Sequence, residues 1–304
     1  MKLAITGGTG FVGRVLVERL IKDHYSLVLL VRNLERARHI FPNKDIEIVP
    51  YVATESGSWQ GSIDGCDAVI NLAGEPISRR WNDQYKQLIL ESRQLGTRKI
   101  VEAIGKAQKK PTLLINASAV GYYGTSQTES FDENSQPGDD FLSQVCQKWE
   151  AEAKNVTKIG TRLLILRFGI VLGSGGGALA KMVASFNLFA GGPIGTGNQW
   201  MSWIHILDLV ELIVFGLEHP EMEGCFNATT TNQVHMREFC STLGKALNRP
   251  CWLPVPGIAL ELILGEGAVI VLQGQKVLPK RTVESGFTFD YPLLEEALEQ
   301  ILSP

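Results

Sequence analysis

The stretch TGGTGFVG, residues 6–13, decides the fold that this sequence predicts, because it joins a short apolar run to an amphipathic helical segment. Gly7 allows a tight turn, Gly10 lets an anionic ligand approach the backbone, and Gly13 lets a helix pack closely on a strand. Unpaired N–H groups and the helix dipole then favour phosphate at the helix N-terminus. The alternative is a glycine-rich turn that binds nothing. We expect a dinucleotide site formed by Gly7, Thr9, Gly10, Phe11, Val12 and Gly13.

Six short β-branched runs alternate with longer helical patterns along the first part of the chain. Such runs are apolar on both faces because helices cover both sides of a parallel sheet, and right-handed crossovers set the winding. The sequence therefore predicts an α/β fold with a Rossmann-type doubly wound parallel sheet. The expected strands are residues 2–6, 26–31, 46–50, 68–72, 112–117 and 162–169, and a long helix is expected from about 83 to 106.

The regularity weakens after residue 170, where glycine-rich loops at 173–178 and 190–197 flank a short helix. We expect a Rossmann domain over residues 1–175 and a smaller substrate-binding C-terminal α/β lobe over residues 176–304, with some segments returning to the Rossmann domain. The elements assigned to this lobe are a helix after Asp208, a strand near 225–229, a helix from about 236 to 247 and a final helix near 293–302.

Composition and charge point to a small-molecule partner. The 304-residue chain is 44% hydrophobic and 20% charged, with a net charge of -3 and neither a basic stripe nor an acidic tail. Nucleic acid and a membrane surface are therefore not expected as partners. The apolar stretch at 258–272 carries two glutamates and makes a poor membrane span. Because no signal peptide is recognisable at the start, we expect a cytoplasmic protein that binds a small-molecule substrate.

Cysteine and histidine spacing argues against a metal. The five cysteines are scattered, odd in number and never spaced C-x-x-C, which disfavours both a disulfide framework and a zinc site. The five histidines never fall within ligand spacing of one another or of a cysteine pair. The sequence therefore predicts no metal site, and it favours a reducing compartment.

Arg32, which follows the second expected strand, indicates which dinucleotide binds. A site for NAD usually offers an acidic residue about here to bond the ribose 2′-hydroxyl. A guanidinium instead binds a 2′-phosphate through paired, charge-assisted hydrogen bonds. Arg36 and Arg38 lie close by in sequence, and all three could be solvated surface arginines. We expect NADP(H) as the cofactor.

Several further motifs carry a family resemblance. They are NLAGEPI at 71–77, ASAVGYYG at 117–124, SWIHILDLV at 202–210, LGEGAVIVLQGQKVLPKR at 264–281 and ESGFTFDYPLLEEAL at 284–298. With the glycine stretch, they resemble the extended short-chain dehydrogenase/reductase superfamily. More narrowly, they resemble its atypical NAD(P)-dependent epimerase/dehydratase, or nucleoside-diphosphate-sugar epimerase, branch. The last two motifs resemble the small C-terminal domain of that branch.

The resemblance implies roles for residues at the ends of three strands. It implies that Asn71, Leu72, Ala73 and Gly74 line the cofactor, since ligands lie outside the carboxyl ends of parallel strands. Ser118 matches the serine that bonds the substrate hydroxyl or carbonyl. Arg167 follows the sixth strand, where relatives contact the nicotinamide side.

One feature that the resemblance implies is missing. Enzymes of the superfamily carry Tyr-x-x-x-Lys on the helix after the fifth strand, where FLSQVCQKWE, residues 141–150, contains no such pair. No tyrosine in the chain has a lysine four residues later. Three substitutes remain open: Glu75 with a pKa raised by burial, Tyr122 or Tyr123 after Ser118, and Cys146, which a core role explains more simply.

Other polar and aromatic residues have both structural and functional interpretations. Asp208 fits an N-cap and His205 a hydrogen-bonded histidine beneath it, although the two could also act in catalysis. Arg93 lies on a helix that in relatives passes the cofactor, so a role toward a substrate phosphate is an alternative to none. Trp81, Trp200 and Trp203 flank glycine-rich loops and could stack on a flat ring or pack in the core.

Two functions remain open at this point. The first is an NADP(H)-binding oxidoreductase or epimerase-like enzyme that acts on a carbonyl or hydroxyl carbon, with a nucleotide sugar as one candidate substrate. The second is an NADP-binding regulatory or scaffold protein with little turnover, which the lost tyrosine and lysine support. The resemblance links the second to cell division. An exposed apolar patch on the second lobe would favour it.

Overall fold

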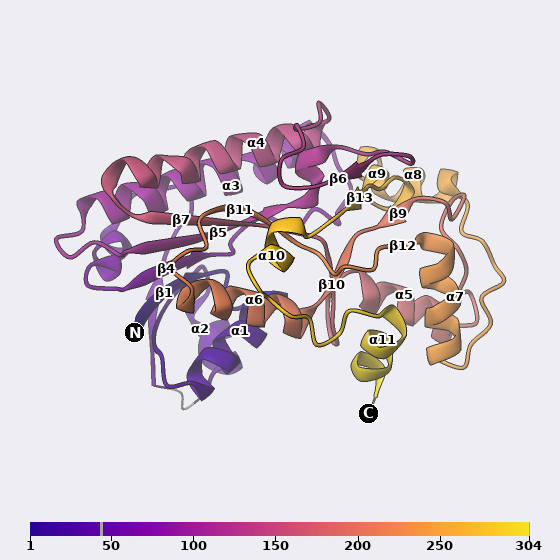
Figure 1. The fold of residues 1–304 in the computed structure, drawn as a ribbon, viewed down its shortest axis with the longest axis horizontal. Helices are drawn as coiled ribbons and strands as arrows, with labels where there is room; N and C mark the ends of the chain where they lie inside the picture. Colours follow the sequence, from indigo (N-terminus) through magenta and orange to yellow (C-terminus); the bar gives the residue numbers. More distant parts are fainter. Residues whose placement is uncertain (43–44, 304) are drawn as a thin grey trace.

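The computed structural model of the chain describes residues 1–42 and 45–303. Its centre is a seven-stranded parallel sheet in the order β11-β7-β5-β4-β1-β2-β3 (Figure 1). The strands are β1 (Lys2–Thr6), β2 (Ser26–Val31), β3 (Ile46–Pro50), β4 (Ala68–Asn71), β5 (Leu113–Ala119), β7 (Arg162–Phe168) and β11 (Gly224–Ala228). The order reverses between β1 and β4, where open α/β sheets bind ligands. The Rossmann-type doubly wound sheet is therefore confirmed.

Helices cover both faces of the sheet, as the two-sided apolar strands predict. On one face lie α1 (Phe11–Lys22), α2 (Leu34–Ile40) and α6 (Ile206–Glu218), and on the other lie α3 (Asp83–Lys106) and α4 (Phe141–Lys154) (Figure 1). Side chains alternate between two cores, so that Leu3 and Ile5 face α1 while Ala4 faces α3. The six expected strands and the helix at 83–106 all form.

The helix expected after Asp208 and the strand expected near 225–229 were counted with the second lobe, some segments of which were expected to return to the Rossmann domain. Both elements lie in the Rossmann layers. The strand β11 pairs in parallel with β7 at the edge of the main sheet, and α6 packs beside α1. Most of α6 is buried, and an added Cβ on Gly216 would collide with the side chain of Leu164. The chain therefore leaves the Rossmann domain after β7 and returns to it with α6 and β11. The glycine-rich loops thus do not mark a single boundary between the two domains.

The second lobe has its own core. The helices α5 (Gly177–Asn187), α7 (Met236–Ala246) and α11 (Leu294–Leu302) enclose Phe186, Trp203, Phe239 and Leu298, and the expected helices near 236–247 and 293–302 are confirmed. Short strand pairs connect the lobe: β8 (Ile170–Leu172) with β10 (Trp203–His205), β9 (Trp200–Met201) with β12 (Val234–His235), and β6 (Ser130–Phe131) with β13 (Lys276–Val277). Its remaining helices are α8 (Gly257–Leu264), α9 (Val269–Leu272) and α10 (Lys280–Glu284).

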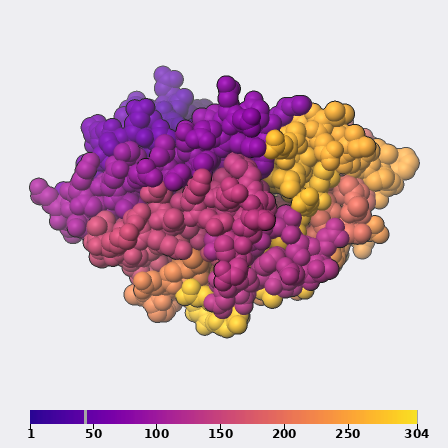
Figure 2. Space-filling model, turned by 90° about the horizontal axis from the view of Figure 1, so that it is seen from above, coloured from indigo at the N-terminus to yellow at the C-terminus, as the bar shows by residue number. Residues whose placement is uncertain are grey.

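Short 3-10 helices occupy four connections: η1 (Ser58–Ile63), η2 (Val120–Tyr123), η3 (Asn155–Ile159) and η4 (Glu266–Ala268). Around η4 the C-terminal part returns to the first domain. The backbone N–H of Trp81 donates to the carbonyl oxygen of Leu264 at 3.1 Å. The Lys86 ammonium lies 2.7 Å from the Glu266 carboxylate. Figure 2 shows this C-terminal segment, in yellow, against violet segments of the first domain. No helix in the described residues is long and apolar enough to span a bilayer.

Two buried side chains tie the C-terminal segment to the start of α6. His205 is the N-cap: its Nδ1 accepts from the Leu207 N–H at 3.2 Å, and its Nε2 lies 2.9 Å from Gln300 Oε1. The expectation that Asp208 is the N-cap is wrong, because the helix begins before it. Asp208 instead accepts the N–H groups of Asp290 and Tyr291 at 2.8 and 3.1 Å. Burial raises the pKa of Asp208 to about 6, although these two N–H groups lower it in part.

The buried histidine predicts a pH dependence of stability. Burial lowers the pKa of His205 to about 4 from an ordinary value of 6.5. Because its folded pKa is depressed, neutral His205 contributes full stability above pH 6.5, and that contribution is lost as the pH falls through 4. As the pH falls from 6.5 to about 4, the free energy of unfolding should decrease more steeply in the wild type than in His205→Gln. The two slopes should differ by up to about 1.4 kcal/mol per pH unit.

Urea unfolding from pH 7 to pH 4.5 measures this difference. Asp208 titrates in the opposite sense in the same window, but it is present in both proteins, so its contribution largely cancels in the comparison. Identical pH dependences of the two proteins would contradict the assignment.

Candidate functional site

Only glycine fits at two positions of the turn after β1. Gly7 has φ +71°, and a Cβ there would lie 2.8 Å from the carbonyl carbon of Leu72. A Cβ on Gly13 would overlap the carbonyl oxygen of Gly7. The first turn of α1 is therefore pressed against the end of β1, and the loop is held next to the end of β4.

The N-terminus of α1 is open to a ligand. Gly10 is exposed and serves as the N-cap without a side-chain hydrogen bond, and the first turn contains no acidic residue. Thr9, Phe11 and Val12 are half-buried around it. Helix N–H groups without a capping side chain attract anions, and a glycine N-cap leaves room for one. These residues fit the pyrophosphate of a dinucleotide.

The Phe11 ring faces the second lobe. Cβ atoms added to Gly173, Gly176 or Gly177 would come within 3.1 Å of this ring or closer. The glycine-rich loop at 173–178 therefore packs directly against the Phe11 ring in the first turn of α1. Phe11 was expected to bind the cofactor, and here its backbone borders the cradle while its ring joins the two lobes.

Arg32 and Glu75 form an ion pair between the ends of β2 and β4. The Arg32 Nη1 lies 2.5 Å from Glu75 Oε1, with the Arg32 side chain 70% exposed and the Glu75 side chain 19% exposed. Glu75 was considered as a free acid near the substrate, but its carboxylate binds the guanidinium instead. The exposed edge of that guanidinium remains available for an anion.

Asn71 joins three strands through a buried hydrogen-bond network. Its Oδ1 accepts from Thr6 Oγ1 at 2.7 Å, and its Nδ2 donates to Thr97 and Asn116 at 3.0 and 2.7 Å. Thr6 Oγ1 also accepts the N–H groups of the two residues after Asn71, each at 3.1 Å. Asn71 was expected to line the cofactor, and its side chain holds the strand ends together. Leu72 and Ala73 are half-buried, and Gly74 is exposed.

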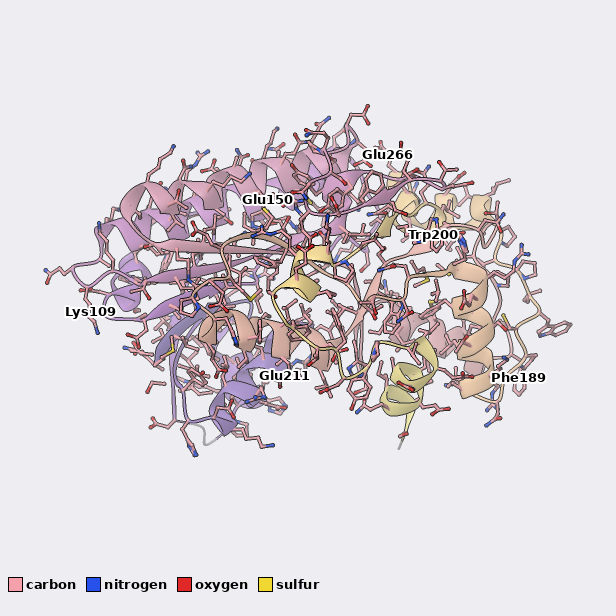
Figure 3. All side chains as sticks on the ribbon, in the orientation of Figure 1. Lys109, Glu150, Phe189, Trp200, Glu211 and Glu266 are labelled. Atoms are coloured by element: carbon pink, nitrogen blue, oxygen red, sulfur yellow. The ribbon has the colours of Figure 1, made fainter. Side chains whose placement is uncertain are left out.

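A buried ion pair lies behind the ends of β5 and β7. Arg167 donates from Nε and Nη2 to the two oxygens of Glu150, both at 2.8 Å, and the two side chains are 3% and 1% exposed. Ser118 Oγ donates to Glu150 Oε1 at 2.8 Å. Glu150 projects from α4 toward the centre of the molecule (Figure 3). Such bidentate, charge-assisted pairs are strong and geometrically specific.

Tyr123 extends this network. Its hydroxyl donates to Asn227 Oδ1 at 2.7 Å and accepts from Arg167 Nη1 at 2.9 Å. Burial raises the pKa of Tyr123 far above its ordinary value of 10, and the hydrogen bonds from Arg167 offset this only in part. Ser118, Tyr123 and Arg167, all expected at the substrate or nicotinamide, therefore each have a partner inside the protein.

Tyr122 differs from its neighbour. It is half-buried, the Arg167 guanidinium carbon lies 3.5 Å from its ring centroid, and burial raises its pKa. Among residues 1–42 and 45–303, no acceptor is found for its hydroxyl proton, whereas Tyr123 donates its own to Asn227. Of the two tyrosines, Tyr122 thus keeps a hydroxyl that a ligand could bond.

The buried residues of α4 in the described structure include no lysine or arginine. Cys146 is buried, its Sγ lies 3.7 Å from the Ala119 carbonyl oxygen, and burial raises its pKa to about 12. Such a thiol stays protonated and packs as an apolar group, as the core interpretation predicts.

The three tryptophans pack within the protein. Trp203 is fully buried and donates to the Asn232 carbonyl oxygen at 2.9 Å, so it does not border an open pocket. Trp81 packs edge-on against Phe141 with ring centroids 5.3 Å apart. Trp200 is half-buried, stacks near His235 and donates to the Gln127 carbonyl oxygen at 3.0 Å.

The sequence reasoning missed Glu150 as the centre of the polar network. A signal for it exists, because Glu150 falls on the same helical face as Val145, Cys146 and Trp149, all of them buried. A lone carboxylate on an apolar helix face calls for a buried cation partner. Arg167, near the C-terminal end of the strand that follows this helix, is the candidate partner.

Comparison with known sequences identifies two matching regions. The profile of the NAD dependent epimerase/dehydratase family matches residues 3–228, and that of a domain of unknown function, DUF1731, matches residues 255–301. The second match coincides with the C-terminal motifs at 264–281 and 284–298.

Related proteins align over nearly the whole chain. The Arabidopsis thaliana protein named epimerase family protein SDR39U1 homolog, chloroplastic, is 48% identical over 304 residues, covering 99% of this chain and 87% of that protein. Epimerase family protein YfhF of Bacillus subtilis is 40% identical over 304 residues, covering 100% and 98%.

Solved structures share the fold. Human epimerase family protein SDR39U1 (isoform 2), crystallised with NADPH, superposes with a TM-score of 0.88 at 35% identity and covers 99% of both chains. A UDP-glucuronic acid 4-epimerase from Bacillus cereus superposes with a TM-score of 0.83 at 19% identity, covering 99% of this chain and 98% of that one. The latter likeness concerns the fold alone.

The ion pair between Glu150 and Arg167 yields a stability prediction. Glu150→Leu or Arg167→Met alone leaves one buried charge without its partner, which should lower the free energy of unfolding by about 3–5 kcal/mol. The double variant should lose less than the sum of the two single losses. Urea unfolding measures all three proteins.

Glu152→Gln serves as the control, because it breaks the half-exposed pair with Arg98 on the same helix. That loss should stay within about 1 kcal/mol. Single losses that simply add in the double variant would show that the pair is not coupled.

Proposed function

The chain belongs to the NAD dependent epimerase/dehydratase family, and from this premise we propose that it binds NADP(H). We further propose that it acts as an oxidoreductase or epimerase-like enzyme on a carbonyl or hydroxyl carbon. A nucleotide sugar is the candidate substrate, in keeping with the family description. The pairing of a glycine cradle with Arg32 carries the proposal.

The choice of NADP(H) over NAD(H) rests on Arg32. No acidic residue ends β2, and the Arg32 side chain that follows it is 70% exposed, which supports the binding of a 2′-phosphate there. Arg36, one helical turn on, is also exposed. The related human protein was crystallised with NADPH, which supports the same choice.

The proposed chemistry assigns different tasks to different residues. The N-terminus of α1 binds the pyrophosphate, and Arg32 binds the 2′-phosphate. The nicotinamide, when bound, supplies or accepts a hydride. Because burial raises the pKa of Tyr122 above its ordinary value of 10, and no acceptor for its hydroxyl proton is found among the described residues, Tyr122 is the proposed donor of a proton to a substrate carbonyl oxygen. Hydrogen bonds and an ion pair inside the protein engage Ser118, Tyr123 and Glu75. Their proposed role is to hold the site in place.

A second candidate function has an observation of its own. Exposed apolar side chains gather on α8 and just before it, where Trp252, Ile258, Leu262 and Ile263 are 65–72% exposed. A group of large apolar side chains exposed together on a protein surface often marks a site where another protein binds. This surface supports an NADP-binding regulatory or scaffold protein with little turnover.

Arg32→Asp tests the cofactor assignment. The substitution replaces attraction for the 2′-phosphate by repulsion, so the Kd for NADPH should rise roughly 10- to 100-fold, while the Kd for NADH should change less than about threefold. Calorimetry on the folded variant measures both values. Lys109→Asp, with the same change of charge at the far end of the molecule (Figure 3), should leave both unchanged. An equal loss for the two coenzymes in Arg32→Asp would refute the assignment.

Turnover separates the two candidate functions. NADPH oxidation followed at 340 nm over a panel of ketosugar nucleotides, simple ketones and quinones should reveal a substrate if the enzyme proposal is right. Tyr122→Phe should then lower kcat with little effect on the Kd for NADPH, since only the proton donor is removed. Tight NADPH binding with no oxidation across the panel would favour the regulatory protein.

A further inference from the structure

Tyr122 lies against a buried cation. The guanidinium carbon of Arg167 lies over the Tyr122 ring, 3.5 Å from its centroid, and a cation is attracted to an aromatic face within about 6 Å. The Tyr123 ring centroid is farther from the same carbon, at 5.1 Å, and Tyr123 contacts Arg167 through its hydroxyl. Arg167 is therefore stacked on Tyr122 and hydrogen-bonded to Tyr123.

Arg167 is held in this stacked position by its other partners. Its Nε and Nη2 donate to the two oxygens of Glu150, both at 2.8 Å, and its Nη1 donates to the Tyr123 hydroxyl at 2.9 Å. Burial lowers the pKa of Arg167, but the hydrogen bonds and the charge of Glu150 raise it by more, so Arg167 stays protonated. A charged guanidinium plane is thus fixed against the Tyr122 ring.

Three titratable groups on other elements act on the Tyr122 phenol. They are Arg167 on β7, Glu150 on α4 and Cys225 on β11. Burial raises the pKa of Tyr122, the charge of Arg167 lowers it, and the charge of Glu150 raises it, with Arg167 having the larger effect of these two charges. Burial also raises the pKa of Cys225, which keeps that thiol neutral. The phenol therefore lies in the field of one dominant cation.

The proposed proton transfer creates a negative charge beside this cation. When Tyr122 protonates a substrate carbonyl oxygen, the phenol O–H bond breaks, a new O–H bond forms on the substrate, and the electron pair stays on the phenolate. A hydride from the coenzyme reduces the carbonyl carbon, and water then returns a proton to the phenolate. A fixed cation stabilises such a developing charge because it does not have to reorient.

We propose that Arg167, stacked on the Tyr122 ring and fixed by Glu150, is the positioning residue that stabilises the Tyr122 phenolate, a role that rests on the proposed function of Tyr122 as proton donor. The buried residues of α4 include no lysine or arginine, so the cation comes from β7 instead. Glu150 holds the guanidinium in place and partly cancels its charge. Removal of Arg167 and removal of Glu150 should therefore change the acidity of Tyr122 in opposite directions.

Titration of the phenol at position 122 tests this role without substrate or coenzyme. 3,5-Difluorotyrosine, which is more acidic than tyrosine, is incorporated at position 122 of the full chain, and its ionisation is followed by fluorine NMR. Arg167→Met should raise the pKa of this phenol by about one unit or more. Glu150→Gln should lower the pKa by about 0.5 unit or more, because the carboxylate charge no longer opposes the cation.

The pair between Arg98 and Glu152 provides the matched control. It also joins an arginine to a glutamate of α4, but the Arg98 side chain is 45% exposed. Because such exposed charges are screened, Arg98→Met and Glu152→Gln should each leave the pKa of the phenol at position 122 within about 0.2 unit of its value in the unsubstituted chain.

An unchanged pKa in Arg167→Met would overturn the proposal. Shifts in the same direction in Arg167→Met and Glu150→Gln would also overturn it, because they would show an effect of packing alone. If either variant does not fold, as judged by circular dichroism, the double variant Glu150→Leu with Arg167→Met replaces both. Its phenol pKa should rise, since Arg167 has the larger effect, and an unchanged or lower pKa would contradict the proposal.

Turnover provides a second readout if the panel of carbonyl compounds yields a substrate. Arg167→Met should then lower kcat roughly 10- to 100-fold, and Arg167→Lys, which keeps the charge, should lower it less than about tenfold. A kcat of Arg167→Met equal to that of the wild type would overturn the proposal. Absence of turnover in the wild type would instead refute the proposed enzyme, while the fluorine titration still decides whether Arg167 stabilises the phenolate.

Discussion

The close packing of α1 on the end of β1 is the contact on which the site depends. Because Gly13 has no side chain, the first turn of α1 touches the carbonyl oxygen of Gly7, and Gly7 in turn fits against the backbone of Leu72. The helix N-terminus is thereby fixed beside the ends of β1 and β4. Phe11, in the same turn, supports the glycine-rich loop of the second lobe, so one short segment sets both the anion cradle and the junction of the two lobes.

Around this cradle, most polar side chains are engaged within the protein. Asn71 ties the strands together, and Glu150 binds Arg167 and Ser118. Fully bonded buried networks of this kind hold strand ends in one arrangement, but they leave few groups to exchange protons with a substrate. Tyr122 is an exception, since no acceptor for its hydroxyl proton is found among the described residues. The chemistry of the site is therefore expected to depend on the cofactor and on Tyr122.

The sequence could predict the parts of the structure that local patterns determine. Two-sided apolar runs predict the strands, and glycine spacing predicts the turn after β1. Contacts between distant segments could not be read in this way. Which segments after residue 175 return to the main sheet could not be predicted, because the pairing of β11 with β7 is a tertiary contact. Asp208 was wrongly predicted as the N-cap because His205 caps the helix first. Likewise, Glu75 was one of several candidate acids, and its ion pair with Arg32, 43 residues away in sequence, could not be predicted from local patterns.

Binding of NADPH to the unmodified protein tests the central claim most directly. Isothermal titration of the folded wild-type chain with NADPH and, separately, with NADH compares the two coenzymes under one buffer and salt condition. The cradle and Arg32 predict a saturable heat with one NADPH per chain and an affinity at least about tenfold weaker for NADH, as expected when a charge-assisted contact is missing. Absence of heat with both coenzymes would contradict the account.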